Sequence, residues 1–231
     1  METTQNPSPE APKSSKNNYV SIDEMIVQMK LTFGNAKLPT IFPVMETVGY
    51  STERIDALQS KLTVLELLQQ TQTKEYADQY AESEKYAAKR SEIDVDFTKH
   101  RALAKILFKT NTEARAALKL DRAKPLAYAD WYQMAVSFYN LLPANAAMLA
   151  KAETIGITAE VLAAQKQALI DLQTLKESQR KETAEAQQAT ENRDRAYDEV
   201  LQLHAEYVKY ARVLLSDSQA LEAIGVRVKG K

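Results

Sequence analysis

Two long stretches without glycine or proline constrain the fold of this chain more than any other feature. The first lies between Gly49 and Pro125, and the second lies between Gly156 and Gly225. Glycine and proline are the residues that most readily interrupt a helix, whereas the Ala, Glu, Gln, Lys and Leu that fill these stretches favour one. The sequence therefore predicts two long α-helices, one after Gly49 and one after Gly156.

The two stretches match each other at a constant offset, because Gly156 lies 107 residues after Gly49. The stretches align at this offset without a gap, and identical residues recur along them. Examples are Glu53 with Glu160, Ala57 with Ala164, Leu62 with Leu169, Leu65 with Leu172, Ala104 with Ala211 and Leu107 with Leu214. We interpret this pattern as an internal duplication. Each repeat would contain a short helix, a connector, a long helix and a terminal short helix.

The first repeat is expected to begin with a short amphipathic helix over residues 22–33. Ser21 and Glu24 form a capping box, in which both side chains can satisfy free backbone amides. Gly34 is expected to end this helix in a left-handed conformation. The segment 43–48 is expected to form one or two helical turns.

The first long helix is then expected from residue 52 to about residue 108, with Ser51 as its cap. Thr110 is expected to cap the short helix that follows, and Thr158 is expected to cap the second long helix. In the second repeat, apolar spacing predicts a helix over 128–141, with Pro143 in the connection after it. Gly225 is expected to end the last short helix.

The middles of the long helices, near 69–92 and 176–199, are poor in large aliphatic residues. An alternative to continuous helices is therefore that each folds back into a hairpin, with the bend near Ser83 or Asn192. Most core residues are expected near the helix ends instead: Leu58, Leu62, Leu65, Leu68, Ile93, Phe97, Ala104, Ile106, Leu107, Phe108, Phe138, Leu162, Leu169, Leu172, Leu175, Val200, Leu201, Val208, Ala211, Val213 and Leu214.

These elements predict an all-α fold, an elongated helical bundle built from two internally repeated units whose long helices pack side by side as in a coiled coil. Residues 1–18 contain three prolines among polar residues and are expected to be a disordered tail. Residues 19–120 would form the first repeat and residues 121–231 the second, packed together as one domain.

Composition excludes several classes of function. The chain has no cysteine, which excludes disulfides and thiolate metal sites, and its formal net charge of -1 gives no reason to expect nucleic acid as a partner. No apolar run reaches the length of a membrane span, and the amino terminus lacks the pattern of a signal peptide. We therefore expect a cytoplasmic protein, with a membrane partner disfavoured.

Histidine and carboxylate patterns do not predict catalysis. The two histidines, His100 and His204, could come near each other when the long helices pair, but Phe97 and Leu201 occupy the positions where a di-iron bundle needs glutamate. Neighbouring carboxylates are typical of a solvated helix face. A glycine-rich phosphate loop and a nucleophile elbow are both absent from the sequence. No catalytic, metal or cofactor residue is predicted.

Three short segments carry a resemblance to known sequences. They are the helix start at 156–160, the segment 137–142 and the ending at 221–226. Together they resemble a group of uncharacterised bacterial all-helical proteins of similar length, over mainly the second half of the chain. The resemblance implies a helical fold and brings no activity with it.

The function expected from these observations is non-enzymatic. We expect a structural or scaffolding protein that self-associates or binds a protein partner through helix faces; the alternative is a membrane-surface or pore-forming helical protein. A homo-oligomer is favoured because the polar middles of the long helices bury little area by themselves. Since aromatic residues are enriched at interfaces, the candidate interface residues are Tyr76, Tyr80, Tyr86 and Tyr197.

Overall fold

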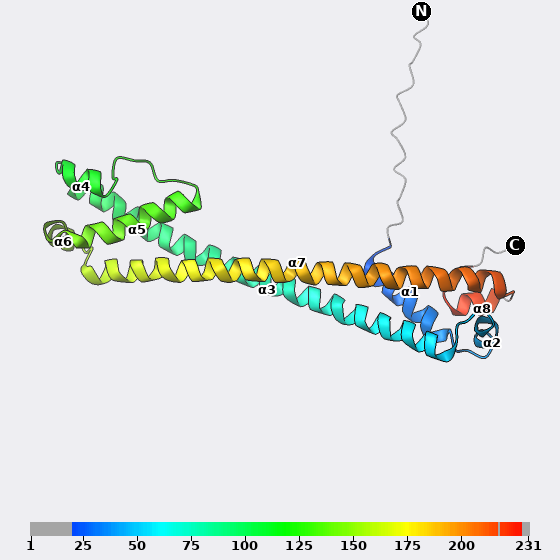
Figure 1. The fold of residues 1–231 in the computed structure, drawn as a ribbon. Helices are drawn as coiled ribbons and strands as arrows, with labels where there is room; N and C mark the ends of the chain where they lie inside the picture. The colour runs from blue at the N-terminus through cyan, green and yellow to red at the C-terminus, as the bar shows by residue number, and fades with distance from the viewer. Residues whose placement is uncertain (1–19, 217, 228–231) are drawn as a thin grey trace, which may run out of the picture. The chain divides into compact units, whose positions relative to one another are not determined.

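The computed structural model describes residues 20–216 and 218–227, and its regular structure there is entirely α-helical. The predicted all-α fold is confirmed. The predicted tail over 1–18 lies outside the described residues. The helices, labelled in Figure 1, are α1 (Ile22–Asn35), α2 (Phe42–Glu46), α3 (Thr52–Leu107), α4 (Thr112–Ala117), α5 (Tyr128–Ala144), α6 (Ala146–Glu153), α7 (Ala159–Leu214) and α8 (Ser218–Ala223).

The long helices α3 and α7 are continuous, and each contains 56 residues. The alternative of a bend near Ser83 or Asn192 is therefore wrong. Gly49 and Gly156 precede the two helices with φ angles of 87° and 82°, in the left-handed region that glycine tolerates best. Both predicted caps are confirmed: Ser51 Oγ accepts from a backbone amide at 3.4 Å and Thr158 Oγ1 accepts from another at 3.3 Å.

The chain divides into two units, each with its own core. The first unit contains the residues up to Leu67 and those from Asp194 onward, and the second unit contains Leu68–Arg193. The start of α3 and the end of α7 belong to the first unit. The end of α3 and the start of α7 belong to the second unit.

In the first unit, α1, α2 and α8 pack beside the start of α3 and the end of α7 (Figure 1). The core is aromatic at its centre, where the rings of Tyr50 and Tyr207 meet edge to face at 4.9 Å and Phe33 meets Tyr207 at 6.1 Å. Most of the helix-end residues expected in this core are buried, but Val213 is 83% exposed, so its prediction was wrong.

Helix α1 satisfies the carbonyl groups at the end of α8 with three polar side chains. Gln28 donates to Gly225 O at 2.7 Å, and Asn35 donates to Ala223 O at 2.6 Å. Between them, Thr32 Oγ1 lies 2.9 Å from Ile224 O. The last carbonyls of a helix lack partners within it, so this polar row fixes α8 against α1.

The capping box that starts α1 is confirmed, because Ser21 and Glu24 satisfy each other's backbone amides. The predicted end of α1 was wrong. Gly34 has no left-handed φ angle, and the helix continues through it to Asn35. Gly225, in contrast, follows α8 with a φ angle of 76°, as expected for a glycine that ends a helix.

In the second unit, α4, α5 and α6 pack with the end of α3 and the start of α7. Helix α5 contributes Trp131, Phe138 and Tyr139, which are among the largest buried side chains of the unit. Pro143 does not lie in a connection but inside α5, and the chain then forms α6, which was not predicted from the sequence.

Further predictions in the second unit need correction. Asn111, and not Thr110, caps α4, because the Asn111 side chain accepts from the Ala114 amide. Ile106 was expected in the core but is 75% exposed. Leu175 is only half-buried, as is Leu68 at the boundary of the unit. Among the helices of the described residues, none is both long enough and apolar enough to cross a membrane.

Candidate binding cleft in the second unit

A buried arginine shapes the loop between α4 and α5. Arg101 of α3 is 5% exposed, and its Nη2 donates to the backbone oxygens of Lys119, at 2.7 Å, and of Arg122. The same nitrogen lies 3.5 Å from Leu120 O. Burial lowers the pKa of the Arg101 guanidinium. Because these carbonyls converge on one donor group, the loop has a fixed path where it leaves α4.

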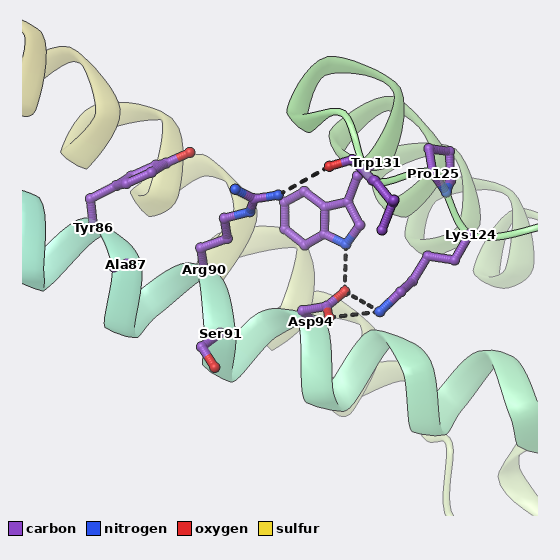
Figure 2. A pocket seen from close by; sticks show the side chains of 9 residues that line it. Tyr86, Ala87, Arg90, Ser91, Asp94, Lys124, Pro125 and Trp131 are labelled. Atoms are coloured by element: carbon purple, nitrogen blue, oxygen red, sulfur yellow. Dashed lines mark hydrogen bonds and ion pairs between the residues drawn. The ribbon is translucent and has the colours of Figure 1, made fainter. Parts of the chain in front are cut away.

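A second anchor holds the end of the same loop. Lys124 Nζ lies 2.7 and 2.6 Å from the two carboxylate oxygens of Asp94 on α3. The indole Nε1 of Trp131 donates to the same carboxylate at 2.7 Å. Figure 2 shows Asp94 between these two donors. One carboxylate therefore joins α3, the loop and the first turn of α5.

These anchors leave a cleft of about 360 Å³ between the loop and α3. Leu126 stands at its edge with 91% of its surface exposed. Arg90 reaches from α3 across the cleft and donates to Leu126 O at 3.4 Å. The residues that line the cleft are Tyr86, Ala87, Arg90, Ser91, Asp94, Lys124, Pro125, Leu126 and Trp131.

Aromatic rings and basic groups alternate next to the cleft. Lys176 Nζ lies 3.2 Å from the centre of the Tyr128 ring, and Tyr132 stacks on the same ring at 5.7 Å. The Arg90 guanidinium lies 5.7 Å from the Tyr128 ring and 5.6 Å from the Trp131 ring. Burial raises the pKa of Tyr128 to about 12, although Arg90 lowers it in part. Tyr128 therefore stays a neutral phenol at physiological pH.

The chemistry of this cleft fits binding better than catalysis. Asp94 is the one carboxylate among its lining residues, and it is already held by Lys124 and Trp131. A general base needs a free lone pair within reach of its substrate. The lining offers an apolar edge and a cation, which are the elements of a recognition surface.

The structure places the two histidines in different units, each with a neutral partner. His100 Nδ1 lies 3.1 Å from the hydroxyl of Tyr139, and His204 Nε2 lies 2.9 Å from Thr32 Oγ1. Burial lowers the pKa of both imidazoles. Both side chains are less than 10% exposed, with values of 8% and 9%, so they belong to the cores of their units.

The four predicted interface tyrosines do not form one cluster. The rings of Tyr76 and Tyr80 lie 6.3 Å apart on α3, and the Tyr76 hydroxyl lies 3.5 Å from Thr190 on α7. Tyr86 lines the cleft and meets Tyr128 at 6.1 Å. Tyr197 belongs to the first unit and is half-buried against its core. Their role in an interface stays a prediction.

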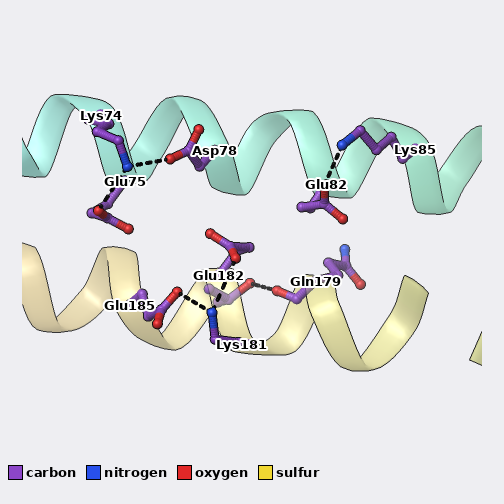
Figure 3. A network of polar contacts seen from close by, with 10 residues as sticks. Lys74, Glu75, Asp78, Glu82, Lys85, Gln179, Lys181, Glu182 and Glu185 are labelled. Atoms are coloured by element: carbon purple, nitrogen blue, oxygen red, sulfur yellow. Dashed lines mark hydrogen bonds and ion pairs between the residues drawn. The ribbon is translucent and has the colours of Figure 1, made fainter. Parts of the chain in front are cut away.

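Three carboxylates meet between the long helices of the second unit. One oxygen from each of Glu75, Glu182 and Glu185 lies within 4.8 Å of the others, and all three residues are half-buried. Two lysines lie beside them: Lys74 is 3.5 Å from Glu75, and Lys181 is 3.2 Å from Glu185 (Figure 3). These lysines offset part of the carboxylate charge, so the group forms a polar network.

No sequence pattern predicted the cleft. A signal for its first anchor is present, because Arg101 follows Phe97 by four residues and precedes Ala104 by three, which places it on the apolar face of α3. A cation on that face needs buried acceptors. Asp94 gives no comparable signal, because its partners lie 30 and 37 residues away in sequence.

Comparison with known protein families, with curated proteins and with solved structures finds no match to this chain.

Proposed function

We propose that this protein is a non-enzymatic scaffold that self-associates through the middle of its long helices. The observation that carries the proposal is the lack of large buried side chains there. In the second unit, no described α3 side chain from Leu68 to Glu92 is buried, and from Lys176 to Arg193 the buried α7 residues are Ala186 and Ala189.

The contacts across this part of the helix pair are mainly polar. Gln179 donates to Ser83 Oγ at 3.2 Å, and Arg193 donates to Gln69 at 3.2 Å. Such hydrogen bonds stabilise the folded state by about 1 kcal/mol each, whereas the conformational entropy lost when one residue is ordered costs about 1–2 kcal/mol. A third helix from another copy would supply the missing apolar burial.

The outer surface of α3 suits such a contact. Tyr80 is 68% exposed and Tyr76 is half-buried beside it, so the Tyr80 ring projects into solvent and the Tyr76 ring lies next to it. Exposed small residues continue the same helix surface, which allows close approach of a second helix. They are Ala77, Ala81 and Ala88.

We also propose that the chain arose by internal duplication. The equal lengths of α3 and α7 support this, as do the left-handed glycines before each of them. Each long helix is followed by a six-residue helix, α4 or α8. The two halves would then present related surfaces to their partners.

Cysteine crosslinking tests the proposed contact. The chain has no cysteine of its own, so one introduced thiol reports on one position. Ala81→Cys lies on the proposed surface, and Ala102→Cys is a matched control at another exposed alanine of α3. We expect oxidation to give a disulfide-linked dimer with Ala81→Cys and little with Ala102→Cys. Equal crosslinking of the two variants would contradict the proposal.

A further inference from the structure

Three basic side chains of the second unit lie near one another, and two of them lie over aromatic rings. They are Arg90 of α3 together with Lys176 and Arg180 of α7, called here the basic cluster. Arg90 faces the rings of Tyr128 and Trp131, and Lys176 lies on Tyr128. Within the described part of the chain, none of the three has a carboxylate within ion-pair distance.

Other cations on the same helices differ in this respect. Lys85 pairs with Glu82 at 2.5 Å, Lys89 pairs with Glu92 at 3.1 Å, and Lys181 pairs with Glu185 at 3.2 Å. These three lysines are neutralised by nearby carboxylates, whereas the members of the basic cluster lie near one another without such a partner.

The members of the basic cluster repel one another. The pKa of Lys176 is lowered, first by desolvation and then by the charges of Arg180 and Arg90. The same two arginines act on Tyr86, whose pKa is raised by burial and lowered in part by their charges. An anion placed among these groups would relieve the repulsion.

We propose that the basic cluster and the adjoining cleft bind an acidic peptide segment of another protein. Carboxylates of the segment would pair with Arg90, Lys176 and Arg180. An apolar side chain of the segment would pack on Leu126, whose surface is 91% exposed, beside Pro125 at the edge of the cleft. This surface differs from the proposed self-association contact, and the inference does not depend on that contact.

The geometry favours a peptide over nucleic acid. Binding of a single strand uses aromatic faces on which bases stack, but Trp131 is only 2% exposed, and Tyr128 is covered by Lys176 and Tyr132. The basic cluster also holds three cations, whereas duplex-binding proteins commonly neutralise about 6–10 phosphates. The features left for recognition are the positive charge of the basic cluster and the apolar edge of the cleft, and both suit an acidic peptide.

The direct test is fluorescence anisotropy with a labelled, glutamate-rich peptide that carries a central leucine. We expect saturable binding at low salt that weakens as salt screens the charges. Arg180→Gln and Lys176→Gln should each weaken the affinity by about tenfold, the loss expected for one charged hydrogen bond. Lys181→Gln is the matched control on α7, because its lysine already has carboxylate partners, and it should bind as the wild type does.

Further variants separate the two parts of the surface. Leu126→Ser should weaken binding of the leucine peptide but not of the same peptide with alanine at its centre. Arg90→Gln should weaken binding of both peptides. Sedimentation of the Arg180→Gln variant should match the wild type, which keeps this test independent of self-association.

Three results would overturn the inference. The first is no binding of the acidic peptide at low salt. The second is an equal loss of affinity in Lys181→Gln and in the variants of the basic cluster. The third is tighter binding of inorganic phosphate or a single-stranded oligonucleotide than of the peptide, which would assign the surface to phosphate groups.

Discussion

The indole Nε1 of Trp131 donates a hydrogen bond of 2.7 Å to Asp94 Oδ1. Trp131 begins the buried face of α5 and is 2% exposed, so this carboxylate replaces water as the acceptor for its N–H group. Lys124 holds both oxygens of the same carboxylate. One acidic side chain therefore helps to hold both the loop and α5 on α3.

Replacement of Asp94 tests this dependence. Asp94→Ala leaves the buried N–H of Trp131 without an acceptor and should lower the free energy of unfolding by about 1–3 kcal/mol. Asp94→Asn keeps an oxygen acceptor and should cost less. Urea unfolding followed by the fluorescence of Trp131, the single tryptophan of the chain, measures both changes. Equal costs for the two variants would show that the indole hydrogen bond contributes little.

Truncation of two aromatic residues tests the placement of the core. Phe138 is 1% exposed, and Phe138→Ala should lower the free energy of unfolding by about 3–5 kcal/mol through lost burial and a cavity. Tyr80 is 68% exposed, and Tyr80→Ala should cost much less at protein concentrations where the chain is monomeric. Chemical unfolding of both variants would measure the difference, and similar costs would contradict the assigned core.

Two glycines should respond to alanine with opposite signs. Gly225 has a φ angle of 76°, and an added Cβ would lie 2.3 Å from Gln28 Nε2, so Gly225→Ala should destabilise by about 1–3 kcal/mol. Gly34 is inside α1 with open space around it, and Gly34→Ala should stabilise by about 0.5–1 kcal/mol. Thermal unfolding measures both variants. Stabilisation by Gly225→Ala would refute the described turn after α8.

Buried histidines should make stability depend on pH. Burial lowers the pKa of His204 from its ordinary value of 6.5, so the unfolded chain takes up its proton first as the pH falls. Stability should therefore be complete above about pH 6.5 and should fall as the pH decreases through the folded pKa. Urea unfolding between pH 7 and 5, above the titration of most carboxylates, measures the slope.

His204→Gln is the variant for that measurement, because glutamine does not titrate and can still bond to Thr32. Its free energy of unfolding should depend less on pH than that of the wild type over the same range. His100→Gln is the companion variant in the second unit, where burial also lowers the histidine pKa. An unchanged slope in both variants would contradict the account.

Local signals predicted the helices well. The capping box at Ser21 and the absence of breakers in α3 and α7 depend on neighbouring residues, so the sequence shows them directly. Predictions failed where a residue's role depends on distant contacts. Glycine commonly ends a helix, yet α1 continues through Gly34. Asn35, the next residue, donates a hydrogen bond to Ala223 of α8.

The candidate cleft also depends on contacts between residues that are distant in sequence. Its anchors join Arg101 to a loop 18–21 residues away and Asp94 to Trp131, 37 residues away.

Hydrophobic patterning also predicted too large a core at the helix ends. Ile106 and Val213 belong to apolar runs, but they are 75% and 83% exposed.

Sedimentation equilibrium over a range of concentrations tests the central claim, self-association through the middle of α3, most directly. We predict that the wild type is a dimer at tens of micromolar. Substitution of both Tyr76 and Tyr80 by glutamate should give a monomer with an unchanged helical circular dichroism spectrum, because charge at the contact opposes association without opening either core. A wild-type chain that stays monomeric at these concentrations would contradict the account.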